Sequence, residues 1–83
     1  MDLMANEEIE QNVLGAILVD SSLFYKILDL NEEVFYSTTH QTLFRAFKSV
    51  SKEFQKIDIG LVGNYIKTFQ PKGLTISYVS NLT

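Results

Sequence analysis

The feature that most constrains this fold is an apolar segment near the N-terminus, EQNVLGAILVD at residues 10–20. Together with the isoleucine just before it, its large apolar residues recur with an α-helical period and share one face: Ile9, Val13, Leu14, Ile17 and Leu18. Asn6 followed by two glutamates is typical of a helix N-terminus. The segment therefore predicts a helix over about residues 6–18.

Three other interpretations of this segment are weaker: a buried strand, a signal peptide and a membrane span. The α-helical period of its apolar residues disfavours the strand. The residues before the segment are acidic, whereas a signal peptide begins with basic residues, and its apolar core is far shorter than the ~20 residues that span a bilayer. We therefore expect no membrane partner. The 83 residues contain no cysteine, which is typical of a reducing compartment, so we expect a cytoplasmic location.

Gly15 lies inside this predicted helix, where a glycine costs about 1 kcal/mol relative to alanine. A residue without a side chain allows another backbone to approach closely. We therefore expect Gly15 to mark a close contact with another helix.

Capping residues divide the next part of the chain into two short elements. A second helix is predicted to begin after the candidate caps at residues 20–22 and to end near Asp29. Its apolar residues are Leu23, Phe24, Ile27 and Leu28. Asn31 then begins a single short turn that is expected to place Phe35 and Tyr36 in the core.

Two longer helical patterns follow. The first is predicted to start at a Thr38 or Thr39 cap and to stop at a polar link over residues 51–56. Its apolar residues are Leu43, Phe44, Phe47 and Val50. Asp58 is typical of the N-cap of the next helix, which carries Ile59, Val62, Ile66 and Phe69 on one side. A strand over residues 56–62 is the competing interpretation, and the four-turn pattern favours the helix.

Pro71 and Gly73 end this pattern, and a last helix is predicted through Ile76, Val79 and Leu82, running to the end of the chain or beyond it. The expected fold class is therefore all-α, a small compact bundle of about five to six short helices. We expect one domain over residues 1–83, with residues 1–5 as a flexible N-terminus, because 83 residues leave no room for a second core.

The expected structural core combines apolar residues with three residues of special role, a glycine, a tyrosine and a histidine: Val13, Leu14, Gly15, Ile17, Phe35, Tyr36, His40, Leu43, Phe44, Phe47, Val62, Ile66 and Val79. Four further aromatics are less easily accommodated in one small core: Phe24, Tyr25, Phe54 and Phe69. Some of them are candidates for a partner surface, although burial in the core or scattered exposure is the favoured alternative for each.

The charges are distributed unevenly along the chain. Residues 1–33 hold eight Asp and Glu against one Lys, whereas residues 34–83 hold two against six Lys and Arg, giving net charges of −7 and +4. Such asymmetry favours association with an oppositely charged partner or a second copy, although a solvated acidic helix beside basic ones explains it too. We expect no direct, specific binding of nucleic acid, because the few basic residues do not offset an acidic chain.

The sequence predicts no catalytic, cofactor-binding or metal-binding residue. His40 is the only histidine, and beside capping threonines it is better explained as a hydrogen-bonded residue that fixes the short turn than as a general acid or base. No zinc, nucleotide-binding or nucleophile-elbow motif is present. The acid pairs Glu7/Glu8 and Glu32/Glu33 lie at predicted helix starts, where the helix dipole explains them.

Four blocks of sequence occur in a fixed order: EQNVLGAILVD, FYSTTHQTLFRAF, KIDIGLV and a glycine followed by YVSNL. Over residues 6–83 they resemble the N-terminal domain of DnaB-family replicative DNA helicases. The matching positions are Glu10, Gln11, Val13, Leu14, Gly15, Phe35, Tyr36, His40, Phe44, Ala46, Ile57, Asp58, Gly73, Tyr78, Val79 and Leu82. Lys72, Gly60, Leu61 and a small insertion after Gly73 depart from the family pattern and indicate a divergent member, for which a phage or plasmid is a candidate source.

This resemblance implies a helical collar domain on a hexameric ring helicase, arranged as a trimer of dimers. Such a domain supports ring assembly and docks the primase, with a helicase loader as a further partner, while ATP and Mg²⁺ act in a separate motor domain of the parent protein. The chain would then be an excised domain that lacks the helical hairpin and the ATPase domain.

Two alternatives to a collar domain remain. The first is a stand-alone small protein that binds a host helicase or primase and modulates replication. A small enzyme or a helix-turn-helix DNA binder is the second, and the acidic balance and missing motifs disfavour it.

Overall fold

The computed structural model describes the backbone of residues 3–83 and the side chains from Glu7 onward. Its elements are α1 (Leu3–Val19), the 3₁₀ helices η1 (Ser21–Lys26) and η2 (Glu32–Val34), α2 (Thr38–Phe54), α3 (Ile59–Phe69) and α4 (Ile76–Ser80). Residues 3–83 contain no strand, so the all-α fold class is confirmed and the alternative strand at residues 56–62 is wrong. Within residues 3–83, no helix combines the length and the apolar character needed to cross a membrane.

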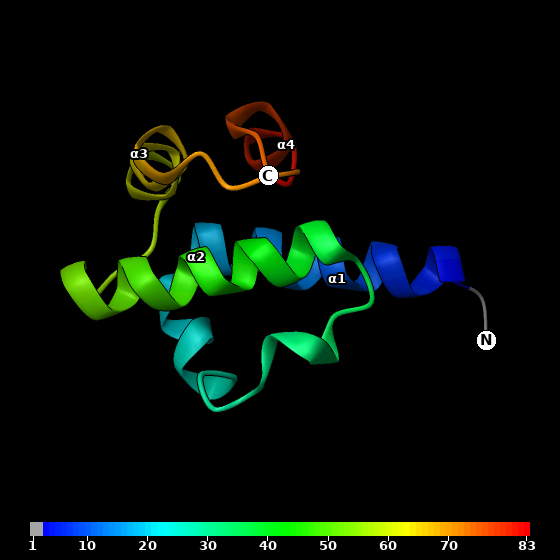
Figure 1. Cartoon of the computed structure of the whole chain (residues 1–83). Helices are drawn as coiled ribbons and strands as arrows, with labels where there is room; N and C mark the ends of the chain where they lie inside the picture. The colour runs from blue at the N-terminus through cyan, green and yellow to red at the C-terminus, as the bar shows by residue number, and fades with distance from the viewer. Residues whose placement is uncertain (1–2) are drawn as a thin grey trace.

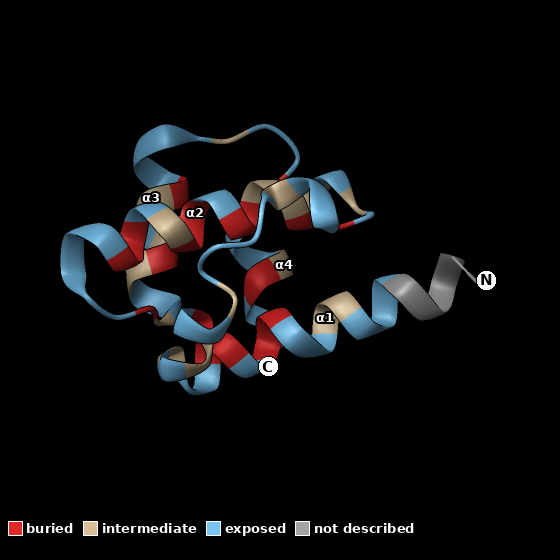
Figure 2. Ribbon diagram, turned by 90° about the horizontal axis from the view of Figure 1, so that it is seen from below, coloured by how far each residue is buried: buried red, intermediate tan, exposed pale blue. Residues whose placement is uncertain are grey.

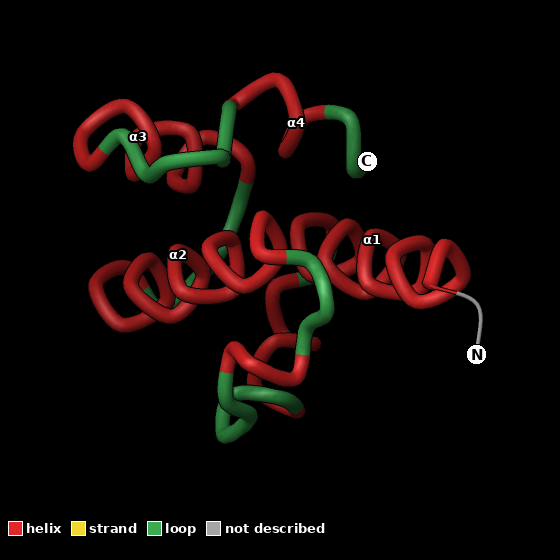
Figure 3. The backbone as a smooth tube through the Cα atoms, turned by 45° about the vertical axis from the view of Figure 1, so that its right-hand side comes forward, coloured by secondary structure: helices red, strands yellow, loops and turns green. Residues whose placement is uncertain are grey.

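The two long helices, α1 and α2, lie side by side and form the centre of the molecule (Figure 1). α3 and α4 cover one side of this pair, and the segment that holds η1 and η2 lies on the other side (Figures 1 and 3). Each side of α2 is therefore covered by a different part of the chain, and grooves can form along both of its flanks.

Side-chain caps start five of the six elements. Asp20, Asn31 and Asp58 each accept a hydrogen bond from a backbone N–H two or three residues further on, which confirms the caps expected at these positions. Thr75 caps α4 in the same way. For α2 the expected cap was wrong, because Ser37 keeps an extended backbone and caps the helix while Thr38 is already helical.

The boundaries of four elements differ from those predicted from the sequence, and the first two of these elements are α1 and η1. α1 already includes Leu3, so Asn6 lies inside the helix, and of the five residues expected to be flexible only residues 1–2 lie outside the described part. The second element is a 3₁₀ helix, because its N–H groups bond carbonyls three residues back, and it ends at Lys26 because Ile27 leaves the helical conformation with φ of −123°.

Two other helix ends were also misplaced. α2 continues through the polar residues 51–54, which have adequate helix propensity, and ends where Gln55 adopts a left-handed conformation with φ of 58°. α4 stops at Ser80, and the N–H of Leu82 bonds the carbonyl of Val79 in a closing turn. The apolar spacing of Ile76, Val79 and Leu82 therefore does not describe one continuous helix.

The core lies between α1, α2, η1 and α3, whose buried residues are marked in Figure 2. Aromatic rings make up its centre. The ring centroids of Phe24 and Phe44 are 5.5 Å apart, those of Phe24 and Phe47 are 6.1 Å apart, and those of Phe35 and Phe44 are 5.1 Å apart. Eleven of the thirteen expected core residues are buried: Leu14, Gly15, Ile17, Phe35, His40, Leu43, Phe44, Phe47, Val62, Ile66 and Val79.

Three burial predictions were wrong. Val13 is 39% exposed, because it follows Ile9 by four residues on the outward side of α1. Tyr36 is 57% exposed, because the backbone at Phe35 is extended and successive side chains there point in opposite directions. Phe24, a candidate for a partner surface, belongs to the core instead and is fully buried because η1 directs it toward Phe44 and Phe47.

Gly15 marks a close backbone contact, as expected, but its neighbour is the turn after α4 rather than another helix. A Cβ at position 15 would collide with the carbonyl oxygen of Leu82, and the carbonyl carbon would be only 3.3 Å away. Glycine is therefore required here by space, and its cost to the helix is offset by the packing of the C-terminal turn on α1.

Replacing glycine by alanine at two helical positions should have opposite effects on the free energy of unfolding. We expect Gly15→Ala to lower it by about 1–3 kcal/mol, because the Leu82 backbone must move. Gly63→Ala in α3 should raise it by about 0.5–1 kcal/mol, since a Cβ there meets nothing within 4 Å. Urea denaturation of both variants measures the effects, and a Gly15→Ala protein as stable as the unmodified one would refute the close-packing explanation.

Candidate functional site

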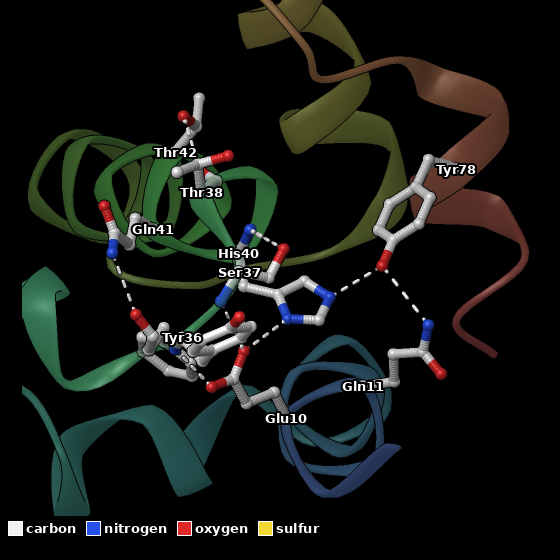
Figure 4. Close-up of polar contacts among 10 residues, drawn as sticks. Glu10, Gln11, Tyr36, Ser37, Thr38, His40, Gln41, Thr42 and Tyr78 are labelled. Atoms are coloured by element: carbon white, nitrogen blue, oxygen red, sulfur yellow. Dashed lines mark hydrogen bonds and ion pairs between the residues drawn. The ribbon is translucent and has the colours of Figure 1, made fainter. Parts of the chain in front are cut away.

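His40, the single histidine of the sequence, lies fully buried in the first turn of α2. Its Nδ1 is 2.7 Å from Oε1 of Glu10 in α1, and its Nε2 is 2.6 Å from the hydroxyl of Tyr78 in α4 (Figure 4). Gln11 Nε2 donates to the same hydroxyl at 3.3 Å. We call Glu10, Gln11, His40 and Tyr78 the histidine cluster.

The histidine cluster satisfies the hydrogen-bonding groups of its buried ring. The Glu10 carboxylate only accepts, so Nδ1 of His40 carries the hydrogen of that bond. Nε2 of His40 and the Tyr78 hydroxyl share the second hydrogen bond of the ring, while Gln11 donates to the oxygen of that hydroxyl. Among the described side chains, no buried nitrogen or oxygen lacks a partner.

Glu10 is held in its ionised form by the same contacts. Burial by itself raises the pKa of this carboxyl group, but this effect is outweighed by the hydrogen bond with His40, the backbone N–H groups of Tyr36 and Ser37 and the charge interaction with His40. The N–H of Tyr36 donates to Oε2 at 2.5 Å, and that of Ser37 donates to Oε1 at 3.3 Å. The net effect lowers the pKa of Glu10 below its ordinary value of 4.5.

Hydrolases activate a nucleophile with a chain of hydrogen bonds that runs from a carboxylate through an imidazole to a hydroxyl. The histidine cluster contains the same three groups in the same order. Here the ring of His40 has no exposed surface and its two nitrogens are occupied by neighbouring helices, so a substrate cannot reach it. The cluster therefore joins α1, α2 and α4. No group of three His, Cys, Asp or Glu side chains that could hold a metal ion occurs in the part of the chain that the structure describes.

The predicted partner-surface aromatics separate into three places. Phe54 and Phe69 line one groove between α2 and α3, which we call the α2–α3 groove, together with Tyr65 and Leu61. The rings of Tyr65 and Phe69 lie 4.8 Å apart, and Phe69 is 65% exposed. Tyr25 is half-exposed on the opposite side of α2, where its hydroxyl donates to the carbonyl of Gln55, and Phe24 is in the core.

This chain is similar to known proteins over nearly its whole length. A model of the DnaB-like helicase N-terminal domain matches residues 2–83. The chain belongs to the DnaB-like helicase N-terminal domain family. It is 32% identical over 81 residues to the replicative DNA helicase DnaB of Treponema pallidum and 34% identical over 80 residues to that of Rhodothermus marinus. These alignments cover 94% and 92% of this chain but only 18% and 8% of the relatives. No solved structure gives a significant match.

In this DnaB-like domain the histidine cluster joins three of the sequence blocks that indicated the family. Glu10 and Gln11 come from the first block, His40 from the second and Tyr78 from the last. We expected His40 to be structural, but the sequence reasoning assigned it neither partner. The sequence shows a carboxylate, a histidine and a tyrosine in three separate blocks. It does not show that their side chains meet in the folded domain.

We expect Glu10→Gln to destabilise the domain at pH 7 by about 1–2 kcal/mol. In either amide orientation, an NH₂ group faces His40 or the N–H of Tyr36, where a carboxylate oxygen had accepted. Because the pKa of Glu10 is lowered in the folded state, its contribution is complete above 4.5 and is lost as the pH falls below that value.

The measurement is urea denaturation of the unmodified and Glu10→Gln proteins at several pH values between 3 and 7. Their difference should shrink below the ordinary carboxyl pKa of 4.5. The exposed Glu33, whose side chain makes no hydrogen bond within the described residues, gives the control Glu33→Gln, which should leave stability unchanged. A Glu10→Gln difference that stays constant with pH would contradict this account.

The hydroxyl of Tyr78 should also contribute measurably to stability. We expect Tyr78→Phe to lower the melting temperature, at a cost of about 1–3 kcal/mol, because Nε2 of the buried His40 loses its partner. Tyr36→Phe is the matched control, since its side chain is exposed and its hydroxyl makes no hydrogen bond with the described residues. Equal melting temperatures for the two variants would count against a stabilising role for the cluster.

Proposed function

We propose that this chain is the collar domain of a replicative DNA helicase and that it acts in ring assembly and primase docking without being catalytic itself. The observation that carries the proposal is the α2–α3 groove, where exposed aromatic side chains gather, while the one histidine is enclosed. Family membership supplies the class of parent protein, since the two relatives named above are replicative DNA helicases. Unwinding, with ATP and Mg²⁺, belongs to other parts of such a parent, and the expected location is the cytoplasm.

The α2–α3 groove has the properties of a protein-docking site. Phe54 and Phe69 are 40% and 65% exposed, and both lie beside the half-buried Tyr65. Clustered aromatics contribute most of the energy at protein interfaces, and they are costly to leave in water without a partner. Glu53, Asn64 and Thr68 line the same groove and supply the polar rim that such interfaces have. We therefore assign primase docking to this groove, with a helicase loader as a further candidate partner.

The test is calorimetric titration of this chain with the helicase-interacting domain of the cognate primase. We expect Phe69→Ala to weaken binding by about tenfold or more, because an exposed aromatic anchor is lost. Since Phe69 is 65% exposed, the fold should be little affected, and circular dichroism checks this. Val34→Ala, at a residue that is 56% exposed in η2, is the matched control and should bind normally. Absence of primase binding, or equal binding by Phe69→Ala, would refute the docking assignment.

A further inference from the structure

A second groove lies between η1 and the C-terminal end of α2, on the flank of α2 opposite the α2–α3 groove (Figure 1). Six residues line it: Tyr25, Leu28, Lys48, Ser51, Lys52 and Gln55. Its volume is about 490 Å³, whereas that of the α2–α3 groove is about 200 Å³. Only the larger volume lies within the ~300–1,000 Å³ range of ligand-binding pockets in proteins. We call it the lysine groove, because two of its six residues are lysines and none is acidic.

Hydrogen bonds fix two side chains in the wall of the lysine groove. The hydroxyl of Tyr25 donates to the carbonyl of Gln55 at 3.2 Å, and its ring meets the buried Phe24 ring edge-on at a centroid distance of 6.5 Å. Nζ of Lys48 donates to the carbonyl of Leu30 at 2.9 Å. Both side chains therefore lose little conformational freedom when a ligand binds, which favours affinity.

The acids of the described residues do not pair with the lysines of this groove. Neither Lys48 nor Lys52 forms an ion pair there, although the chain has ten Asp and Glu against seven Lys and Arg. Hydrogen bonds from Arg45 occupy both oxygens of Glu32 and lower the pKa of this carboxyl group, and the charge of Lys48 makes the smallest contribution to that effect. Glu53, next to Lys52 in the sequence, lines the α2–α3 groove instead. The positive charge of the lysine groove is therefore available to a ligand.

The lysine groove combines this charge with accessible apolar surface, since Tyr25 and Leu28 are 51% and 39% exposed. We propose that it binds an acidic peptide segment of another protein. An apolar side chain of the segment lies against Tyr25 and Leu28, and its carboxylates lie beside Lys48 and Lys52. The two lysines are one helical turn apart, about 5–6 Å between their Cβ atoms, so acids one turn apart on a helical segment match both. Charges beyond about 8 Å are screened at physiological ionic strength, so the two lysines act on such a segment more strongly than the net charge of −3.

Two other kinds of ligand fit the groove less well. Nucleic acid requires a row of positive charges that follows its phosphates, whereas the groove has two lysines on a chain of net charge −3. A membrane surface requires a broad apolar face, whereas the apolar residues of the groove are only Tyr25 and Leu28. The lysine groove shares no residue with the α2–α3 groove, so the inference does not depend on the proposed docking of primase.

Fluorescence anisotropy of a labelled peptide tests the proposal. The probe is a short peptide of aspartates around a single leucine, added to the whole chain at low ionic strength, where screening is weak. We expect Lys52→Glu and Leu28→Ser each to weaken binding of this probe about fivefold or more, because the first reverses a charge contact and the second removes an apolar one. Replacing the aspartates of the probe by asparagine, or its leucine by serine, should weaken binding as well. Lys52 is exposed and Leu28 lies outside the core, so circular dichroism should show an unchanged fold.

Control variants separate this groove from the rest of the surface. Lys67→Glu makes the same charge change at an exposed residue of α3, and Phe69→Ala alters the α2–α3 groove, so both should bind the probe normally. Lys52→Glu should in turn leave primase binding unchanged, which keeps a failure of one docking assignment distinct from a failure of the other. Absence of probe binding, or equal binding by Lys52→Glu and the unmodified chain, would rule out the lysine groove as a peptide site. Tighter binding of a labelled oligothymidylate, lost with Lys52→Glu, would assign the groove to nucleic acid and overturn the proposal.

Discussion

The two hydrogen bonds of the His40 ring are the constraint on which the rest of this domain depends. Burial of an imidazole is unfavourable unless its polar nitrogens find partners, and an unsatisfied one costs about 1–3 kcal/mol. One partner, Glu10, comes from α1 and the other, Tyr78, from α4, while His40 itself lies in α2. The ring is therefore satisfied only when these three helices are correctly placed, so the histidine cluster specifies the packing as well as stabilising it.

The junction of α1 with the C-terminal turn depends on the same side of α1. Gln11 bonds the Tyr78 hydroxyl, and Gly15, one helical turn further on, receives the carbonyl of Leu82. A polar contact and a steric gap, four residues apart on one helix face, thus hold the end of the chain from two points. The apolar segment that contains both residues is consequently more than a core helix, because it positions α4 through groups that have no hydrophobic role.

A structural feature could be predicted from the sequence when the residues that form it lie close together along the chain. The caps at Asp20, Asn31 and Asp58 act two or three residues away, so a short stretch of sequence identifies them. Glu10 and His40 are 30 residues apart, and His40 and Tyr78 are 38 apart, so no local pattern reveals that they meet.

The predictions of burial failed where the spacing of apolar residues does not show which way a side chain points. Val13 fits the helical face of its apolar neighbours, yet α1 has no element covering that edge and the side chain is exposed. Phe24 lies in a 3₁₀ helix, whose three-residue turn directs side chains differently from the α-helix that the sequence predicted. The candidate partner surface was consequently correct in exposure only for Tyr25, Phe54 and Phe69.

The polar residues at the end of α2 are where fold and proposed function meet. A helix that stopped before residue 51, as the polar stretch suggested, would remove Phe54 from the α2–α3 groove. Continuation to Phe54 places residues 49, 50, 53 and 54 on one flank and residues 48, 51, 52 and 55 on the other. One helix end thus lines two grooves that face different ways, the α2–α3 groove and a second one beside Tyr25 and Leu28. The groove proposed for primase docking therefore depends on the continuation of α2 through its polar end.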